Sequence, residues 1–223
     1  MIERVGRRLR LVLGRPAARP PLHDEGATAA PSLPEVEFIG YAEDCLLIGH
    51  IRLNADRLSD LLNAHEEYQL VDVLGEDLST GATIEIQEIL VTRDELLLVH
   101  ATGPRGDPGR RQPTRQHLIA LQIGPYHVRG YLHALPGSDP MASFRRRKPM
   151  VPLTEAWVEY ASGSVRQRRR VASLIVNRHR VDWITEADDE PVELPDFALH
   201  AEKGPLRRDL IGRVLALEDS QPG

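Results

Sequence analysis

The sequence predicts a mainly β protein built from two tandem five-stranded small barrels, with a short helix toward each end of the chain. Five short strand-like segments, each bounded by turn residues, fill residues 35–102, and the same order of segments recurs in residues 116–185. Charge separates the repeats: residues 35–102 carry 15 acidic and 3 basic side chains, whereas residues 104–185 carry 5 acidic and 15 basic ones. The central expectation is therefore a duplicated β module whose repeats bear opposite charge.

The N-terminal region, residues 1–34, is expected to form a basic helix followed by a proline-rich linker. Apolar side chains recur near one helical face within residues 2–13, namely Ile2, Val5, Leu9 and Val12, with arginines elsewhere on that helix. Five prolines follow between residues 16 and 34, and proline fixes φ and removes a backbone donor. This linker should therefore be extended.

The acidic first repeat, residues 35–102, contains five predicted strands and one short helix. We expect the strands at residues 36–42, 45–53, 68–75, 82–92 and 96–101. In the fourth strand Ile84 and Ile86 alternate with Glu85 and Gln87, which is the pattern of a half-buried strand. Leucines at helical spacing predict one or two helical turns at residues 57–63.

The basic second repeat, residues 116–185, follows a linker of turn residues at 103–115. Its strands are expected at residues 117–123, 126–135, 151–160, 169–177 and 181–184, with a broken segment at 136–148. The repeats align through Gly49 with Gly130, residues 70–73 with 153–156, and residues 90–93 with 175–178. Domains of roughly 70 residues are marginally stable alone, so the repeats should pack on each other or assemble into oligomers.

The tail, residues 186–223, is acidic and is expected to end in an amphipathic helix. Pro205 is a favourable first helical residue, and the helix is expected at residues 205–218. Its apolar stripe comprises Leu206, Leu210, Val214 and Leu217. Such a stripe is typical of a helix that packs on a core or on a partner.

Composition limits the make-up of the core and excludes internal disulfides and membrane-spanning segments. Hydrophobic residues make up 41% of the chain and aromatic residues only 4%, so the core must consist mainly of Leu, Val and Ile. The single cysteine, Cys45, excludes an internal disulfide and suits a small buried side chain. No apolar run reaches the roughly 18 residues that span a bilayer, and we expect a cytoplasmic protein.

No motif indicates catalysis, a cofactor or a metal. The nine histidines form no H-x-x-x-H pair, and one cysteine cannot build a thiolate metal site. Phosphate-binding, dinucleotide-binding and serine-nucleophile motifs are missing from the sequence. We therefore expect a protein that is not an enzyme and that needs no cofactor.

The order of segments resembles the Sm-like fold, a bent five-stranded barrel that binds RNA as a ring. Gly49 lies in the second predicted strand, Asp60 and Asn63 form D-x-x-N before the third, and Arg93 lies between the fourth and fifth. The resemblance implies RNA contacts at Asp60, Asn63 and Arg93. The sequence departs from the family at Asp94, where the family has glycine, and the second repeat has Asp139 but Ala142 in place of the asparagine.

Two basic segments of the second repeat are the candidate binding site. Their residues are Arg145, Arg146, Arg147 and Lys148 before one strand, and Arg166, Arg168, Arg169 and Arg170 at the start of another. If both lie near strand ends, they merge into one cationic patch. We expect this patch to bind an acidic protein surface, through a protein partner or self-association, in a non-catalytic scaffold or binding protein.

Other roles for the basic residues stay open. The same charges can bind the phosphates of RNA or DNA with a steep dependence on salt. They can also pair with the acidic repeat or the acidic tail of their own chain. A third possibility is peripheral membrane contact through residues 2–13, which Gly6 and the short apolar face weaken.

Overall fold

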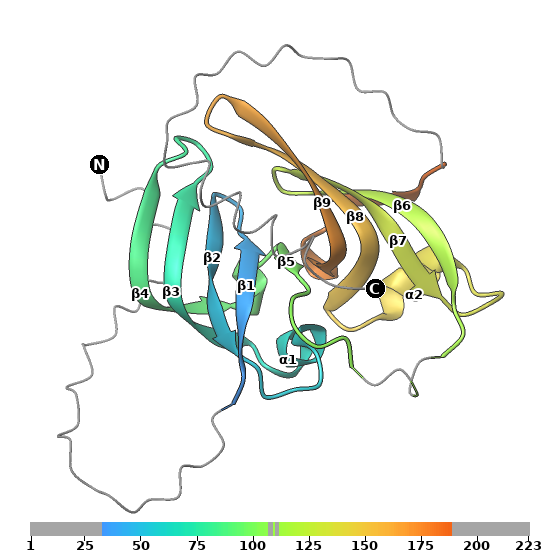
Figure 1. The fold of residues 1–223 in the computed structure, drawn as a ribbon. Helices are drawn as coiled ribbons and strands as arrows, with labels where there is room; N and C mark the ends of the chain where they lie inside the picture. Colours follow the sequence, from blue (N-terminus) through green and yellow to red (C-terminus); the bar gives the residue numbers. More distant parts are fainter. Residues whose placement is uncertain (1–32, 107–108, 110–111, 189–223) are drawn as a thin grey trace, which may run out of the picture. The chain divides into compact units, whose positions relative to one another are not determined.

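One antiparallel sheet of ten strands runs through the part of the chain that this computed structural model describes, residues 33–106, 109 and 112–188 (Figure 1). The predicted mainly β class is confirmed, and two short α-helices accompany the strands within these residues. The helices predicted at residues 2–13 and 205–218 lie outside the described residues. Within those residues, no helix is long and apolar enough to cross a membrane.

The first half of the sheet, residues 35–102, has its strands and helix where the sequence predicts them. The elements are β1 (Glu35–Tyr41), β2 (Cys45–Arg52), α1 (Leu58–Ala64), β3 (Glu67–Asp77), β4 (Thr83–Thr92) and β5 (Leu98–His100). A short 3-10 helix at Arg93–Glu95 forms the turn before β5, and the Glu95 carboxylate accepts a hydrogen bond from the Thr92 N–H at 2.8 Å. This capping contact ends β4 and sets the direction in which β5 leaves.

The second half, residues 115–186, repeats this succession and contains a helix that the sequence did not predict. The elements are β6 (Arg115–Ile123), β7 (Tyr126–Ala134), α2 (Pro140–Arg146), β8 (Met150–Ser162), β9 (Val165–Asn177) and β10 (Trp183–Glu186). The Asp139 carboxylate accepts hydrogen bonds from the N–H groups of Met141 and Ala142, and Pro140 is the first helical residue. Only Pro140 and Phe144 are buried, which leaves α2 too little apolar periodicity to be recognised.

The two halves have the same strand order. The sheet runs β10-β6-β7-β8-β9-β5-β1-β2-β3-β4, so each half reads fifth, first, second, third and fourth strand. The halves join where β5 pairs with β9, with Leu98 opposite Val176, Val99 opposite Ile175 and His100 opposite Leu174. The described strands therefore form one continuous sheet and not the two separate closed barrels that the sequence predicted, because β5 pairs with β9 across the halves and the outer strands, β10 and β4, do not pair with each other.

A glycine bends both halves at the same place. The β2–β3 register shifts between Ile48 and His50, around Gly49, and the β7–β8 register shifts between Arg129 and Tyr131, around Gly130. A Cβ at Gly49 would lie 2.9 Å from the Val71 carbonyl oxygen, and one at Gly130 would lie 3.0 Å from the Ala156 Cβ. Glycine lets the neighbouring strand approach this closely, and each bulge strengthens the bend of its half.

Each bulge coincides with a residue of positive φ in the third strand of its half. Asp72 in β3 and Glu155 in β8 are the only non-glycine residues with positive φ in the described part of the chain, at 50° and 48°. Both positions belong to the segments that the sequence aligns, residues 70–73 with 153–156. The two halves thus share an unusual backbone conformation as well as an order of strands.

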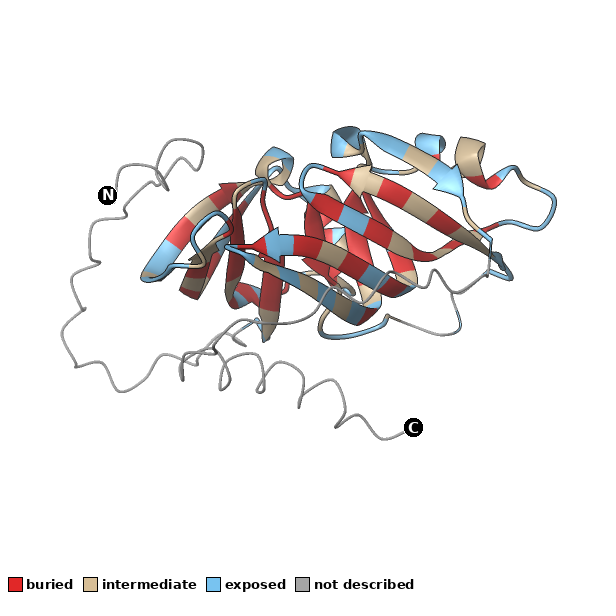
Figure 2. Ribbon diagram, turned by 90° about the horizontal axis from the view of Figure 1, so that it is seen from above, coloured by how far each residue is buried: buried red, intermediate tan, exposed pale blue. Residues whose placement is uncertain are grey.

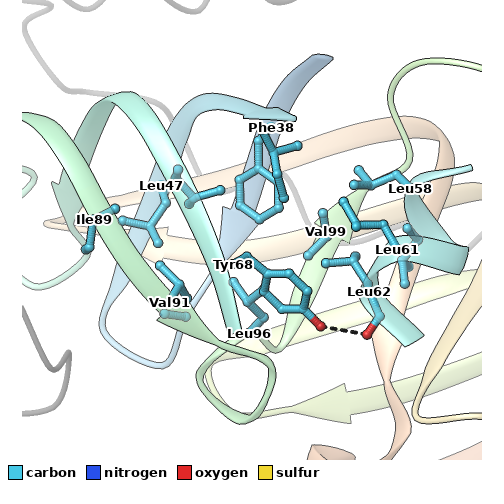
Figure 3. Close-up of a cluster of buried hydrophobic side chains, with 14 of the residues drawn as sticks. Phe38, Leu47, Leu58, Leu61, Leu62, Tyr68, Ile89, Val91, Leu96 and Val99 are labelled. Atoms are coloured by element: carbon cyan, nitrogen blue, oxygen red, sulfur yellow. Dashed lines mark hydrogen bonds between the residues drawn. The ribbon is translucent and has the colours of Figure 1, made fainter. Parts of the chain in front are cut away.

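Buried hydrophobic residues line both halves, and one cluster of the first half includes residues of the second. Burial alternates along β3 and β7, as expected where one face of a sheet is covered, whereas β5 and the C-terminal ends of β1 and β9 are buried at consecutive positions, so both faces are covered there (Figure 2). Leu58, Leu61 and Leu62 of α1 lie near Tyr68 and Val99, and the Tyr68 hydroxyl donates a hydrogen bond to the Leu62 carbonyl at 2.6 Å (Figure 3). The same cluster includes Met150 and Ile175 of the second half, so the two halves share buried apolar surface.

Candidate functional site

Three arginines of the basic segment 166–170 lie in a row on the β8–β9 hairpin. We call Arg166, Arg168 and Arg170 the arginine row. Side chains alternate along β9, so Arg166, Arg168 and Arg170 face solvent together, with side-chain exposures of 55%, 49% and 65%. The register places Arg170 opposite Trp157 and Arg168 opposite Glu159 on β8. The row therefore shares one face with an exposed aromatic ring and a carboxylate.

Glutamates of the second half partly neutralise this row. Arg166 and Arg168 both contact the Glu159 carboxylate, at 2.9 and 3.2 Å, and Arg170 contacts Glu155 at 2.7 Å. The Arg170–Glu155 pair is exposed on both sides and contributes at most about 1 kcal/mol. Arg170 can therefore exchange its partner for another anion at little cost, whereas the Glu159 side chain is only 15% exposed and holds Arg166 and Arg168 more firmly.

Trp157 adds an aromatic surface to the arginine row. Trp157 is 37% exposed, and the guanidinium carbons of Arg168 and Arg170 lie 4.5 and 5.9 Å from its ring centroid. Guanidinium groups at these distances are attracted to the face of an indole. Arg169 faces the other side of β9, half-buried and 5.8 Å from the Tyr160 ring centroid, and is not part of the row.

The other basic segment, residues 145–148, has three exposed cations at the end of α2. Arg145, Arg146 and Lys148 are exposed, and none of them takes part in an ion pair among the described residues. Arg147 has a different place, because its guanidinium donates to the His133 carbonyl and its own carbonyl accepts from Arg178 Nε at 2.6 Å. Burial lowers the pKa of Arg147. We call Arg145, Arg146 and Lys148 the α2 cluster.

The two basic segments lie at opposite ends of the β8–β9 hairpin. The α2 cluster precedes Met150, which pairs with Asn177, whereas the arginine row is near the turn where Ser162 pairs with Val165. Lys148 and Arg166 thus flank a strand of 13 residues, about 40 Å of extended chain. From the sequence we expected the two segments to merge into one cationic patch. The register separates them instead, because each segment borders a different end of β8.

Asn63 and Arg93, two residues of the Sm-like pattern, lie near the C-terminal end of α1. The Asn63 side chain exchanges two hydrogen bonds with the backbone of Met150, donating to its carbonyl at 2.8 Å and accepting from its N–H at 3.0 Å. Arg93 donates to the His65 carbonyl at 3.3 Å and lies 3.5 Å from the Glu66 carboxylate. Asp60 is exposed in the first turn of α1. The polar atoms of Asn63 therefore link α1 to β8.

Sequence reasoning missed a buried aromatic cluster where the halves meet. The Tyr41 hydroxyl and His100 Nε2 are 2.9 Å apart, and the Tyr41 ring contacts Tyr126 and Tyr160 edge to face with centroids 5.2 and 5.7 Å apart. The Tyr126 hydroxyl donates to the Ala42 carbonyl at 2.6 Å. Burial, aided by the charge of Arg169, lowers the pKa of His100 to about 3, so the imidazole is neutral. The four rings come from strands far apart in sequence, and no local pattern connects them.

The structure offers no centre for metal or thiol chemistry in its described residues. No group of three His, Cys, Asp or Glu side chains is arranged there to hold a metal ion. Cys45 is buried, and burial raises the pKa of its thiol to about 12. What the described surface does offer is charge, with acidic residues on the first half and two basic segments on the second.

The ion pairs join the halves at one point only among the described residues. Arg180 of the second half lies 3.6 Å from Glu43 of the first half, and the remaining pairs are within one half. Apart from this pair, the described ion pairs do not neutralise the charge of one half with that of the other. Comparisons of this chain with protein-family models, with curated protein sequences and with solved structures give no match.

Proposed function

We propose that this protein is a non-catalytic scaffold or binding protein whose basic second half engages an acidic protein surface. The observation that carries the proposal is the α2 cluster, in which three exposed cations stand together without a carboxylate partner among the described residues. Charges that are not used within a fold commonly steer and orient a partner. A cytoplasmic location is part of this proposal.

Duplication of a small-barrel module, similar to the Sm-like fold, is also part of the proposal. It is supported by the common strand order of the halves, by the glycine bulges at Gly49 and Gly130, and by the positive φ of Asp72 and Glu155. Divergence of two originally similar modules accounts for their opposite charge. One half would keep an acidic surface and the other a basic one, each suited to a different side of a contact.

Charge reversal at the α2 cluster tests the proposal. Arg145→Glu with Arg146→Glu is expected to weaken binding of fluorescein-labelled poly-L-glutamate at low salt by at least about tenfold, because two attractive charges become repulsive. Fluorescence anisotropy measures this affinity. The matched control is Arg166→Glu with Arg170→Glu, which changes the net charge equally at arginines that already contact glutamates. Equal losses in both variants, or no binding by the unmodified protein, would contradict the proposal.

A second candidate function, binding of single-stranded nucleic acid, is favoured by one specific observation. Trp157 is exposed between Arg168 and Arg170, so a base could stack on the ring while the arginines contact phosphates. Trp157→Ala is then expected to weaken binding of a short single-stranded RNA by about tenfold, measured by fluorescence anisotropy. Trp183→Ala removes the other exposed tryptophan and is the control. This candidate is rejected if neither RNA nor duplex DNA binds at low salt.

A further inference from the structure

Both tryptophans of this chain are exposed in the second half. They are Trp157 on β8 and Trp183 on β10, with exposures of 37% and 47%. An indole ring is apolar over its faces and polar at its N–H group, so it is most stable where one side is apolar and the other is wet. What lies between and around the two rings decides which ligand they suit.

The register of the sheet places the two rings on the same face. Residues directly opposite each other on neighbouring antiparallel strands share a face, as do residues two apart in one strand. Trp183 is opposite Gln122, and Gln122 is opposite His127. His127 in turn is opposite Glu159, which is two residues from Trp157 in β8. The ring centroids of His127 and Trp183 are 6.3 Å apart, which agrees with this placement. We call this side of β6–β10 the tryptophan face.

The tryptophan face is broad. Figure 1 shows β6, β7, β8 and β9 side by side, and β10 pairs with β6. Three strand spacings separate β10 from β8, which is about 14 Å across the sheet. The side chains between the rings include Gln122, His127 and Arg129, which are exposed or half-buried. A ligand of a few atoms cannot contact both rings at once, whereas an extended surface can.

Arginines surround one of the two rings. Trp157 is opposite Arg129 on β7 and opposite Arg170 on β9. Together with the rest of the arginine row, these residues place four guanidinium groups on the tryptophan face. The carboxylates that contact the row are those of Glu155 and Glu159. The surroundings of Trp157 therefore carry an excess of positive charge.

We propose that the tryptophan face binds the surface of a bilayer that contains anionic lipids. Tryptophan concentrates at the boundary between lipid headgroups and acyl chains. Arginine binds phosphate through paired N–H groups while its alkyl stem lies along apolar groups. Anionic lipids also attract basic side chains near their surface. This inference goes beyond the proposed function, because strands form the tryptophan face and the α2 cluster lies at the end of a helix.

A bilayer suits this face better than a folded protein partner does. The residues that contribute most to a protein interface cluster near its centre, in a well-packed pocket. Here Trp157 and Trp183 stand about 14 Å apart, with polar side chains between them. In a lipid interface each ring enters by itself, and the polar side chains stay at the level of the headgroups. The spacing of the rings thus favours lipid.

Charge makes the two rings unequal. Exposed carboxylates lie in β10 or next to it, at Asp182, Glu186 and Asp188. Anionic headgroups repel these carboxylates and attract the arginine row, in which Trp157 lies 4.5 Å from one guanidinium carbon and 5.9 Å from another. Trp157 is therefore expected to enter the lipid more deeply than Trp183.

Intrinsic fluorescence of the full chain tests this inference, because both of its tryptophans are on the tryptophan face. Vesicles of phosphatidylcholine with about one third phosphatidylserine should shift the emission to shorter wavelength, and phosphatidylcholine alone should not. Brominated acyl chains should quench the emission, since bromine quenches only rings that reach the lipid. Trp183→Ala and Trp157→Ala leave one ring each, and bromine should quench Trp157 more strongly. The reverse order would overturn the proposed orientation.

Cosedimentation with the same vesicles compares the affinities of charge variants. Arg170→Gln is expected to weaken binding about fivefold, because it removes one basic side chain near an anionic surface. The matched control is Arg52→Gln, which should change binding little. Arg52 is also an exposed arginine in an exposed ion pair, with Glu35, but it belongs to the first half.

The same measurement compares the aromatic contribution with that of another exposed apolar side chain. Trp157→Ala should weaken vesicle binding at least about fivefold, because a large apolar surface no longer leaves water. The control is Ile84→Ala on β4, where Ile84 is 45% exposed, and it should bind like the unmodified protein. Equal losses in Trp157→Ala and Ile84→Ala would overturn the inference.

Other contacts give different results in these experiments. Vesicle binding without a change in tryptophan emission would assign the contact to another segment, such as residues 2–13, and would overturn the inference. An equal shift with poly-L-glutamate or single-stranded RNA in place of vesicles would overturn it too, because these polyanions offer no lipid interface. If no vesicles bind while Arg145→Glu with Arg146→Glu still weakens poly-L-glutamate binding, this inference fails and the proposed function stands.

Discussion

Asn177→Ala is expected to lower the free energy of unfolding by about 3 kcal/mol, because it leaves backbone carbonyls of the other half without a donor. Asn177 is fully buried, and its amide donates to the carbonyls of Arg93 and Leu96 at 3.0 Å each. Its side-chain oxygen also accepts from the His179 N–H at 3.2 Å. The side chain therefore ties the end of β9 to the turn that precedes β5. Urea denaturation followed by circular dichroism measures the change.

Asn63→Ala is the matched control for this prediction. Asn63 also bonds backbone of the other half, at Met150, but it is half-buried. Water can replace part of its bonding, so its loss should cost about 1 kcal/mol. A change of under about 0.5 kcal/mol for Asn177→Ala, the size of an ordinary surface substitution, would show that the junction does not depend on Asn177.

Acid is expected to destabilise the protein through His100. The pKa of His100 is about 3 in the folded protein, against 6.5 for an ordinary histidine, because burial disfavours the imidazolium. Between these two values the unfolded chain binds a proton that the folded chain does not. The free energy of unfolding therefore falls by up to about 1.4 kcal/mol for each pH unit between 6.5 and about 3, and this contribution is constant above 6.5.

His100→Gln should flatten this part of the pH profile, because glutamine does not titrate. Urea denaturation at a series of pH values between neutral and acid measures the slope for each variant. His50→Gln, at an exposed histidine, is the control and should keep the slope of the unmodified protein. Identical slopes for His100→Gln and the unmodified protein would mean that His100 becomes protonated without unfolding.

The strands could be predicted from the sequence because each carries a local pattern. Alternation of Ile84 and Ile86 with polar neighbours marks β4, and turn residues mark the ends of most strands. The helix α2 escaped prediction even though Asp139 and Pro140 are favourable starting residues, since a seven-residue helix with two buried side chains shows little periodicity. Local pattern thus gave the elements but not the short helix that carries the α2 cluster.

The arrangement of the site depends on contacts that no local pattern contains. Arg166 and Arg170 were identified as basic residues, but their pairing with Glu159 and Glu155 follows from the β8–β9 register. The contact of Asn63 with Met150 joins residues 87 positions apart. Charge content can be read from composition, whereas the partner of each charge requires the register of the sheet.

The shared apolar cluster makes the two halves one cooperative unit. Met150 and Ile175 of the second half are buried among side chains of the first half such as Phe38 and Leu62. Melting either half alone would leave apolar surface of the other half in contact with water, at a cost of about 25 cal/mol for each Å² exposed. Substitutions in one half are therefore constrained by the other, and the surface charge of each half can change far more freely than the residues at their junction.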